Sequence, residues 1–433
     1  MNPRTIDVAA LHQRAGLLQL TTLPPLALYV HLPWCLKKCP YCDFNSHELT
    51  APTLPAVAAP RGGAFRPGKP GSGTGRALDV GLELRYLDAL RCDLEAALPL
   101  VWGRRVVSVF IGGGTPSLFS PEAIGQLIAD VRARLPLEPG CEITLEANPG
   151  TFERDRFRAF REAGVTRLSV GVQSFDDAKL KALGRVHDRA QAIAAVEEAS
   201  AAFDTFNLDL MYALPGQSFA ECEADVRQAL AFEPPHLSVY HLTLEPNTLF
   251  AVRPPANLPD DDTAFEMLDR ITELTTAAGL ARYEISAYAR LGHRCQHNLN
   301  YWQFGDYLGI GAGAHSKLSF AHRILRQTRW REPVAYMQQA QNGTAVSSEQ
   351  EVARDELPFE FMLNALRLRE GFELTRFAER TGLAMTAIQR ALEAGEAKGL
   401  IGRDLQRVWP TERGFDFLSD LQALFLPPDR PAR

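Results

Sequence analysis

The first part of the chain alternates short apolar runs with longer amphipathic stretches. The runs are rich in β-branched residues, which favours strands, whereas the stretches have the three-to-four-residue spacing of helices. Strands are predicted at residues 28–32, 106–111, 142–146, 167–172, 206–211 and 237–242. Helices are predicted between them at residues 86–98, 121–135, 152–163, 189–202 and 219–232. This alternation predicts an α/β fold of six parallel βα units, as an open sheet or a barrel.

Residues with distinctive chemistry lie at or after the ends of the predicted strands, except Asp209, which lies within one. They are Cys35, Cys39 and Cys42, the turn Gly112–Gly114 with Thr115, then Glu146 with Asn148 and Pro149, Gln173, Asp209 and Thr243. Ligands of parallel α/β folds bind at the carboxyl ends of the strands. The sequence therefore predicts one ligand site on one rim of the sheet.

A different pattern occupies the C-terminal part. Helices are predicted at residues 374–380, 386–399 and 412–424, with a hairpin at 401–410. Helix, turn, helix and hairpin is the order of a winged-helix fold, so a helical, winged-helix-like domain is predicted. Many such domains bind nucleic acid, but the second helix balances Arg390 and Lys398 with Glu393 and Glu396. The basic surface that phosphates require is lacking, and nucleic acid is not an expected partner.

Composition divides the chain further. Residues 46–80 are rich in Pro and Gly, which predicts a mobile surface insertion because such a segment buries too little to offset its ordering entropy. The expected division is an N-terminal segment, the βα units, an extension of them and the C-terminal domain. Their ranges are 1–26, 27–250, 251–345 and 346–433.

The overall composition indicates a cytoplasmic globular protein. Of 433 residues, 46% are apolar and 23% charged, and the net charge is −6. No apolar window is long enough for a membrane-spanning helix, and polar residues interrupt the N-terminus, unlike a signal peptide. Four cysteines outside the cluster are scattered singly, unlike a secreted disulfide framework. They are Cys92, Cys141, Cys222 and Cys295.

The C-x3-C-x2-C spacing of Cys35, Cys39 and Cys42 offers three thiolates in one loop. Three thiolates can hold a [4Fe–4S] cluster that keeps one iron open for another ligand. The alternative is a zinc site whose fourth ligand is His31, Asp43 or His47. The convergence of other residues on the same rim favours the cluster.

The other rim residues match a ligand with an amino acid part and a nucleoside part. Glu146 can pair with an ammonium and Arg185 with a carboxylate. Gln173 and Asp209 can accept hydrogen bonds from a ribose, and Tyr41 can stack on an adenine ring. A structural role remains the alternative for each residue taken singly.

Together these residues resemble the oxygen-independent coproporphyrinogen III oxidase-like family of radical S-adenosylmethionine (radical SAM) proteins. The resemblance implies a partial (βα)6 barrel in which Cys35, Cys39 and Cys42 ligate a [4Fe–4S] cluster. It also implies SAM as a second cofactor. The residues implied for SAM are Gly113, Gly114, Thr115, Glu146, Gln173, Arg185, Asp209 and Thr243, with Tyr29 and Tyr41 beside them.

The chain can be compared with two branches of that family. The dehydrogenase branch carries a fourth cysteine two residues after the third, where this chain has Phe44. The H-N-x-x-Y-W motif at residues 297–302 and the glycine-rich segment 309–316 instead resemble the HemW haem-chaperone branch. That resemblance implies haem as cargo, client haemoproteins as partners and no coproporphyrinogen oxidase activity, and it leaves open whether SAM is cleaved. The alternative function is oxygen-independent coproporphyrinogen III oxidation.

A haem carrier needs an axial ligand, and imidazole is the obvious one. His297, beside Tyr301 and Trp302, is one candidate, although it can equally form hydrogen bonds in the floor of the barrel. His315 is the other candidate. The resemblance also implies that the C-terminal domain caps the open barrel or docks a client.

Overall fold

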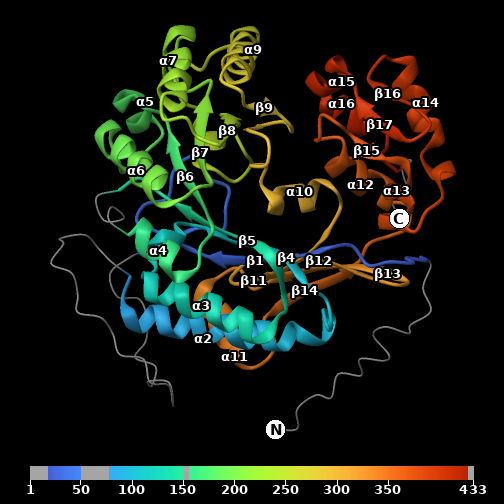
Figure 1. Cartoon of the computed structure of the whole chain (residues 1–433), viewed down its shortest axis with the longest axis horizontal. Helices are drawn as coiled ribbons and strands as arrows, with labels where there is room; N and C mark the ends of the chain where they lie inside the picture. The colour runs from blue at the N-terminus through green and yellow to red at the C-terminus, as the bar shows by residue number, and fades with distance from the viewer. Residues whose placement is uncertain (1–17, 50–77, 151–155, 428–433) are drawn as a thin grey trace.

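The computed structural model describes residues 18–49, 78–150 and 156–427. Within them, one sheet has the order β14-β13-β12-β11-β1-β4-β5-β6-β7-β8-β10-β9 (Figure 1). Its middle is formed by the predicted parallel strands. They are β1 (Leu26–Leu32), β4 (Val106–Gly113), β5 (Leu137–Ala147), β6 (Arg167–Gln173), β7 (Phe206–Tyr212) and β8 (His236–His241). The edge strands β14 and β9 do not pair with each other, so the barrel is partial.

Helices connect these strands, and polar caps fix where several of them begin. Ser120 caps α3 through the Ala123 amide, and Asp188 and Ser218 form capping boxes at α6 and α7. The helices are α2 (Val80–Ala97), α3 (Pro121–Arg134), α4 (Phe157–Ala163), α5 (Asp177–Ala182), α6 (Arg189–Ala202), α7 (Phe219–Leu230), α8 (Leu249–Val252) and α9 (Asp261–Ala277), with short 3-10 turns at Leu98–Leu100 and Pro116–Leu118. The predicted α/β alternation is confirmed.

The sheet extends beyond the predicted strands at both edges. On one side β11 (Asp306–Ile310) pairs parallel with β1, and β12 (His315–Phe320), β13 (Arg323–Arg329) and β14 (Val346–Glu351) continue antiparallel. On the other side β10 (Ala287–Ala289) and β9 (Ala281–Arg282) follow β8. Between these edges, α10 (Gln296–Trp302) packs on β4 and β1 and also contacts the C-terminal helix α12 (Leu357–Ala365) (Figure 1).

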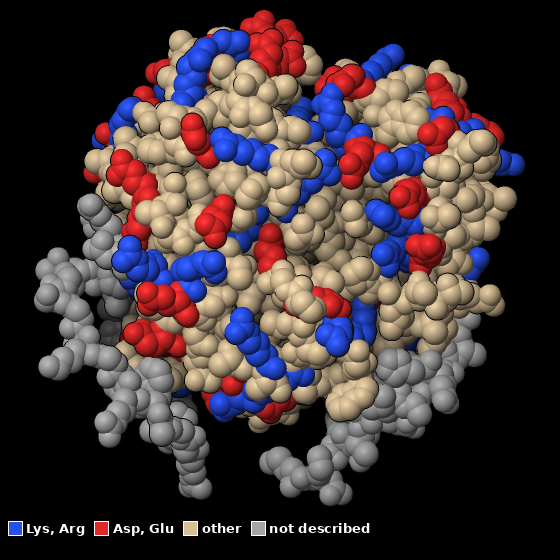
Figure 2. Space-filling model, viewed as in Figure 1, with Lys and Arg blue, Asp and Glu red and all other residues tan. Residues whose placement is uncertain are grey.

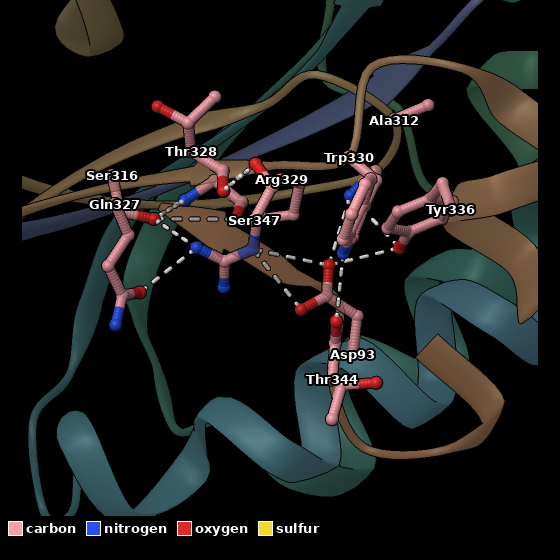
Figure 3. A network of polar contacts seen from close by, with 12 residues as sticks. Asp93, Ala312, Ser316, Gln327, Thr328, Arg329, Trp330, Tyr336, Thr344 and Ser347 are labelled. Atoms are coloured by element: carbon pink, nitrogen blue, oxygen red, sulfur yellow. Dashed lines mark hydrogen bonds and ion pairs between the residues drawn. The ribbon is translucent and has the colours of Figure 1, made fainter. Parts of the chain in front are cut away.

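A buried ion pair joins the added strands to the helical layer. Arg329 of β13 lies with its Nε 3.2 Å from an Asp93 carboxylate oxygen of α2, and both side chains are almost fully buried. Tyr336 of α11 (Pro333–Gln341) donates to the same carboxylate at 3.0 Å. Figure 3 shows Arg329 and Tyr336 approaching Asp93 from opposite sides. The pair therefore has the additional hydrogen bonds that a buried charge requires.

The C-terminal part has the predicted helix, turn, helix and hairpin. After α12 come β15 (Phe372–Glu373), α13 (Leu374–Thr381), a 3-10 turn (Met385–Ala387), α14 (Gln389–Ala397), β16 (Ile401–Arg403), β17 (Arg407–Pro410), α15 (Glu412–Asp416) and α16 (Leu418–Ala423). The last predicted helix is two helices, because Phe417 leaves helical geometry at ψ 46°. Phe361 packs edge-on against Phe372 and Phe377 in a separate core. The face of this part seen in Figure 2 intersperses acidic and basic residues.

The segment predicted as an insertion lies largely outside the described residues. Its described ends belong to the fold: β3 (His47–Glu48) pairs parallel with β2 (Trp34–Cys35), and Asp79 caps α2 through the Leu82 amide. The β2–β3 pair closes the loop that carries the cysteines.

Candidate functional site

The cysteine loop is held between β2 and β3. Cys35 ends β2 and is buried, whereas Cys39 and Cys42 are half-buried in the loop. The Cys42 amide donates to the Cys39 carbonyl at 3.1 Å, which closes a turn between these two cysteines. Burial, together with the two neighbouring sulfurs, raises the pKa of Cys35 to about 11.

Each of the three sulfurs has at least one polar side chain within hydrogen-bonding distance. Thr115 Oγ1 donates to Cys35 Sγ at 3.6 Å, and Arg185 Nη1 donates to Cys39 Sγ at 3.6 Å. Ser46 Oγ lies 3.7 Å from Cys42 Sγ. Donors around the sulfurs stabilise thiolate charge and are one of the factors that set the potential of an iron–sulfur cluster. The donor set therefore fits the predicted cluster.

The arrangement of the thiols can be compared with the geometry of a zinc site, which is the alternative to an iron–sulfur cluster. Ligands of one tetrahedral zinc lie about 4 Å apart, because each Zn–S bond is about 2.3 Å. Among the described residues, no three His, Cys, Asp or Glu side chains form a group suited to one metal ion. Cys39 and Cys42 nevertheless lie near enough to raise the pKa of Cys35. The described residues thus show no preformed site for a single zinc ion, whereas the three thiols lie in one loop and interact with one another.

The glycines after β4 are required by close packing. Gly113 has φ +124°, and a Cβ on it would lie 2.7 Å from the His31 ring. A Cβ on Gly114 would lie 2.6 Å from the Trp34 carbonyl oxygen. The Gly114 and Thr115 amides donate to the Leu32 and Trp34 carbonyls, both at 2.8 Å. Only glycine allows the end of β4 to meet the cysteine loop so closely.

One cavity of about 400 Å³ joins the cysteines to the carboxyl ends of the strands. Its walls include all three thiols and every predicted SAM residue except Tyr29. These residues are Tyr41, Gly113, Gly114, Thr115, Glu146, Gln173, Arg185, Asp209 and Thr243. We call it the cluster cavity. It continues into the barrel as far as Arg167 and Asn298.

The carboxyl group of Glu146 has no basic side chain beside it among the described residues. Its Oε2 accepts a hydrogen bond from the Gly113 amide at 2.9 Å, and no described Lys, Arg or His lies within ion-pair distance of it. Burial raises the pKa of Glu146 to about 8, and the charge of Asp209 adds to the effect. A ligand amino group would supply the missing donor, so this position fits the amino acid part of SAM.

Arg185 is fixed by three contacts beside the cysteine loop. Besides the Cys39 sulfur, its guanidinium donates to Asn148 Oδ1 at 2.6 Å and to the Gly171 carbonyl at 2.9 Å. Asn148 in turn donates to Thr115 Oγ1 at 2.9 Å. Asn148, which the sequence placed on the predicted rim without assigning it a ligand, is therefore a residue of the site. Arg185 Nε is buried without a partner.

Gln173 ends β6, and Asp209 lies in the middle of the neighbouring strand β7. Gln173 has φ +69°, a left-handed conformation that turns the chain out of β6. Asp209 accepts hydrogen bonds from Ser169 at 3.0 Å and from Asn207 at 2.8 Å. Burial nevertheless raises the pKa of Asp209. These neutral donors orient the carboxylate and leave it without a counter-charge in direct contact.

A second cavity of about 370 Å³ adjoins the first. It shares Asp43, Phe44, Gly113 and Glu146 with the cluster cavity, and we call it the aromatic cavity. Phe44, at the position of the dehydrogenase's fourth cysteine, is 58% exposed. The remaining walls are mainly aromatic or basic and include Tyr29, His31, Tyr301, Tyr307, His315 and Arg331. Tyr29 thus lies on the far side of this shared wall, with its hydroxyl 2.9 Å from His31 Nδ1.

The two haem-ligand candidates differ in accessibility. His297 is 3% exposed and lines neither cavity; its ring stacks on Phe110 at 4.9 Å and meets Tyr301 edge-on. Burial lowers the pKa of His297 to about 3, and its Nε2 has no partner. His315 is exposed at the start of β12, with Nδ1 3.3 Å from Thr328 Oγ1. His31 has contacts on both ring nitrogens.

Fold and site define a protein of the radical SAM class. The model of the Radical SAM superfamily matches residues 29–229, and that of the HemN C-terminal domain matches residues 352–417. Membership of the superfamily implies a [4Fe–4S] cluster and SAM.

Sequence relatives define the family within that class. The chain is 46% identical to "Heme chaperone HemW" of Escherichia coli (strain K12), covering 94% of this chain and 100% of that protein. It is 42% identical to "Heme chaperone HemW" of Haemophilus influenzae, covering 93% and 98%. The chain therefore belongs to the HemW family of radical SAM proteins.

A solved structure agrees at the level of the fold. Coproporphyrinogen III oxidase HemN of Escherichia coli superposes with a TM-score of 0.74 at 22% identity, covering 93% of this chain and 90% of that chain. Identity this low bears on the fold alone. In the part of the chain that the structure describes, no helix has the length and apolar character needed to cross a membrane.

Proposed function

We propose that this protein binds haem and transfers it to client haemoproteins in the cytoplasm. It would do so while holding a [4Fe–4S] cluster on Cys35, Cys39 and Cys42. The observation that carries the proposal is the identity to heme chaperones over nearly the whole chain. Phe44 in place of a fourth cysteine and the aromatic cavity beside it support the same function. Coproporphyrinogen oxidation, the alternative, is not favoured.

SAM is proposed to bind in the cluster cavity. Glu146 would accept from its amino group, Arg185 would pair with its carboxylate, and Asp209 and Gln173 would bind its ribose. A bound cluster supplies the electron that can cleave SAM. The role of Arg185 and Thr115 is to orient the ligand and to donate to the sulfurs.

Haem is proposed to occupy the aromatic cavity, with His315 as the axial ligand. The exposed Nε2 of His315 is available because the Thr328 contact involves Nδ1. Arg331 lines the same cavity and can pair with a haem propionate. His297 would act behind Tyr301 as a positioning residue, because its buried ring cannot reach a ligand without moving Phe110 or Tyr301.

We also propose the four-part division 1–26, 27–250, 251–345 and 346–433. The two matched family models support its second and fourth parts. The C-terminal domain would dock a client or cap the barrel. Its contact with α10, the helix of the H-N-x-x-Y-W motif, supports a role close to haem.

The deciding experiment compares cargo binding with catalysis on the same sample. Anaerobically reconstituted protein is titrated with haem by absorbance, and a second portion receives SAM, a reductant and coproporphyrinogen III. Saturable haem binding, transfer to an apo-haemoprotein and no porphyrinogen turnover are expected. Formation of protoporphyrinogen, or an absence of haem binding, would refute the proposal.

A further inference from the structure

The floor of the cluster cavity contains two buried polar atoms that lack partners. Arg167, the first residue of β6, is 2% exposed, and its Nη2 makes no hydrogen bond. Thr144 of β5 is 1% exposed, and its Oγ1 makes none either. Both residues line the cavity. A buried donor without an acceptor costs free energy, so two at one place indicate a missing acceptor.

The two atoms belong to neighbouring positions on the same face of the sheet. Thr144 and Arg167 are direct partners in the parallel pairing of β5 with β6. Their side chains therefore project side by side into the barrel. Asn298 of α10 lines the same cavity. A guanidinium, a hydroxyl and an amide thus contribute to its walls.

The remaining contacts of Arg167 leave this side of the guanidinium free. Its Nη1 donates to the His293 carbonyl at 3.1 Å and lies 3.7 Å from Glu142 Oε2. Glu142 is itself occupied, because its Oε1 accepts from the Gln296 and His297 amides at 2.9 and 3.2 Å. The charge of Glu142 is thus shared between Arg167 and the start of α10. Nη2 is left without an acceptor in a residue that lines the cavity.

We propose that Arg167 and Thr144 form a binding subsite for a carboxylate on the cavity floor. One carboxylate oxygen would accept from Arg167 Nη2 and the other from Thr144 Oγ1, which satisfies both orphaned atoms. The subsite lies beyond the residues proposed for SAM and belongs to the molecule that shares the cavity with it.

The carboxylate has two sources of the same chemistry: the second propionate of a haem in the aromatic cavity, the one not paired with Arg331, which would reach across the wall that the two cavities share, or a free organic acid. The first source rests on the proposed function, and the second does not. The experiment therefore uses three probes on cluster-loaded protein with SAM. Haem and haem dimethyl ester are titrated by absorbance, and acetate is followed by saturation-transfer NMR.

Thr144→Val is the sharper variant, because it removes only the orphaned hydroxyl. Without a ligand, the melting temperature should be unchanged or higher, whereas carboxylate affinity should fall several-fold. Arg167→Gln should lower carboxylate affinity about tenfold, and Arg167→Lys should retain part of it. Thr275→Val is the matched control: its hydroxyl bonds the Ile271 carbonyl at 2.8 Å in α9, so stability should fall and binding should not.

The probes separate the outcomes. Loss of haem affinity with unchanged ester affinity identifies a propionate, and variant-sensitive acetate binding with unchanged haem affinity identifies a free acid. If both variants bind all three probes as the wild type does, or lose haem and ester equally without an acetate effect, the subsite is refuted. Wild-type protein that binds no haem would refute the proposed function, while the acetate measurement still decides the subsite.

Discussion

Arg185 Nη1 lies 3.6 Å from Cys39 Sγ, and the same guanidinium is fixed by Asn148 and the Gly171 carbonyl. Its charge is therefore held in one direction beside the sulfur. The neighbouring Cys39 and Tyr41 raise the pKa of Arg185 despite its burial, so it stays positive. A fixed positive charge favours the more negative, reduced form of a nearby cluster.

Arg185→Gln should lower the reduction potential of the cluster, because this charge and one sulfur hydrogen bond are lost. SAM affinity should fall about tenfold, since a charge-assisted contact to the ligand carboxylate is lost with them. A redox titration followed by electron paramagnetic resonance and a SAM titration measure the two effects. Arg185→Lys, which retains the charge, should shift the potential less. A potential equal to that of the wild type in both variants would contradict this role.

Cys39→Ala should abolish the brown colour and visible absorbance of anaerobically purified protein, because a cluster needs all three thiolates. Iron and sulfide analysis checks the loss. Cys92→Ala is the matched control, since Cys92 is a half-buried residue of α2 outside the site. An intact chromophore in Cys39→Ala would overturn the cluster assignment.

Glu146 should make SAM binding depend on pH. With its pKa raised to about 8, the carboxyl is protonated at neutral pH and accepts a ligand amino group poorly. SAM affinity should therefore increase as pH rises toward about 8, and Glu146→Gln should flatten this dependence. Parallel SAM titrations between pH 6 and 9 test it, and equal slopes for both proteins would exclude Glu146.

The raised pKa of Glu146 also predicts how the stability of the fold changes with pH. A carboxyl whose pKa is raised in the folded state binds its proton more tightly there than in the unfolded chain. Its contribution to stability is therefore lost as pH rises from its ordinary range through about 8. Glu146→Gln, which cannot ionise, should melt at a higher temperature than the wild type at pH 8. The difference should shrink near pH 5.

His315→Ala should weaken haem binding by about 10- to 100-fold if His315 is the axial ligand. His297→Phe preserves the stack on Phe110 and should change haem affinity much less. His241→Ala, an exposed histidine on the cluster cavity, is the control. Haem titration and the Soret spectrum of each variant decide between the two candidates. The reverse ranking would place the iron at His297.

Asp93→Asn should destabilise the fold by about 3–5 kcal/mol, because the buried Arg329 charge loses its partner. Thermal and urea unfolding measure the change. The double variant Asp93→Leu with Arg329→Met should recover much of the loss, since it leaves no unpaired charge. A single variant as stable as the wild type would show that the pair is dispensable.

The parallel strands could be predicted because each carries a short run rich in apolar and β-branched residues between two helical stretches. The added strands could not. β13 carries three arginines and β14 is polar and mostly exposed, so neither shows a period that distinguishes strand from loop. The sequence placed the start of α2 at residue 86, whereas the helix begins at Val80. Gly81 weakens the helical pattern near the cap at Asp79.

The site followed from the sequence wherever an unusual residue ends a strand. Thr144 and Arg167 could not be assigned to the site, because the pattern of a buried strand does not reveal which side chains point into the barrel. Arg167 in particular stands at the start of an apolar run, where a charged residue reads as a strand boundary. Only the pairing of β5 with β6 places it beside Thr144.

Gly113 and Glu146 line both the cluster cavity and the aromatic cavity. A ligand on one side that changes the charge of Glu146 alters the electrostatic field on the other. Thermodynamic linkage then requires reciprocity: SAM changes haem affinity by the same factor by which haem changes SAM affinity. Because the two cavities share this wall, SAM binding and haem release would form a single coupled equilibrium.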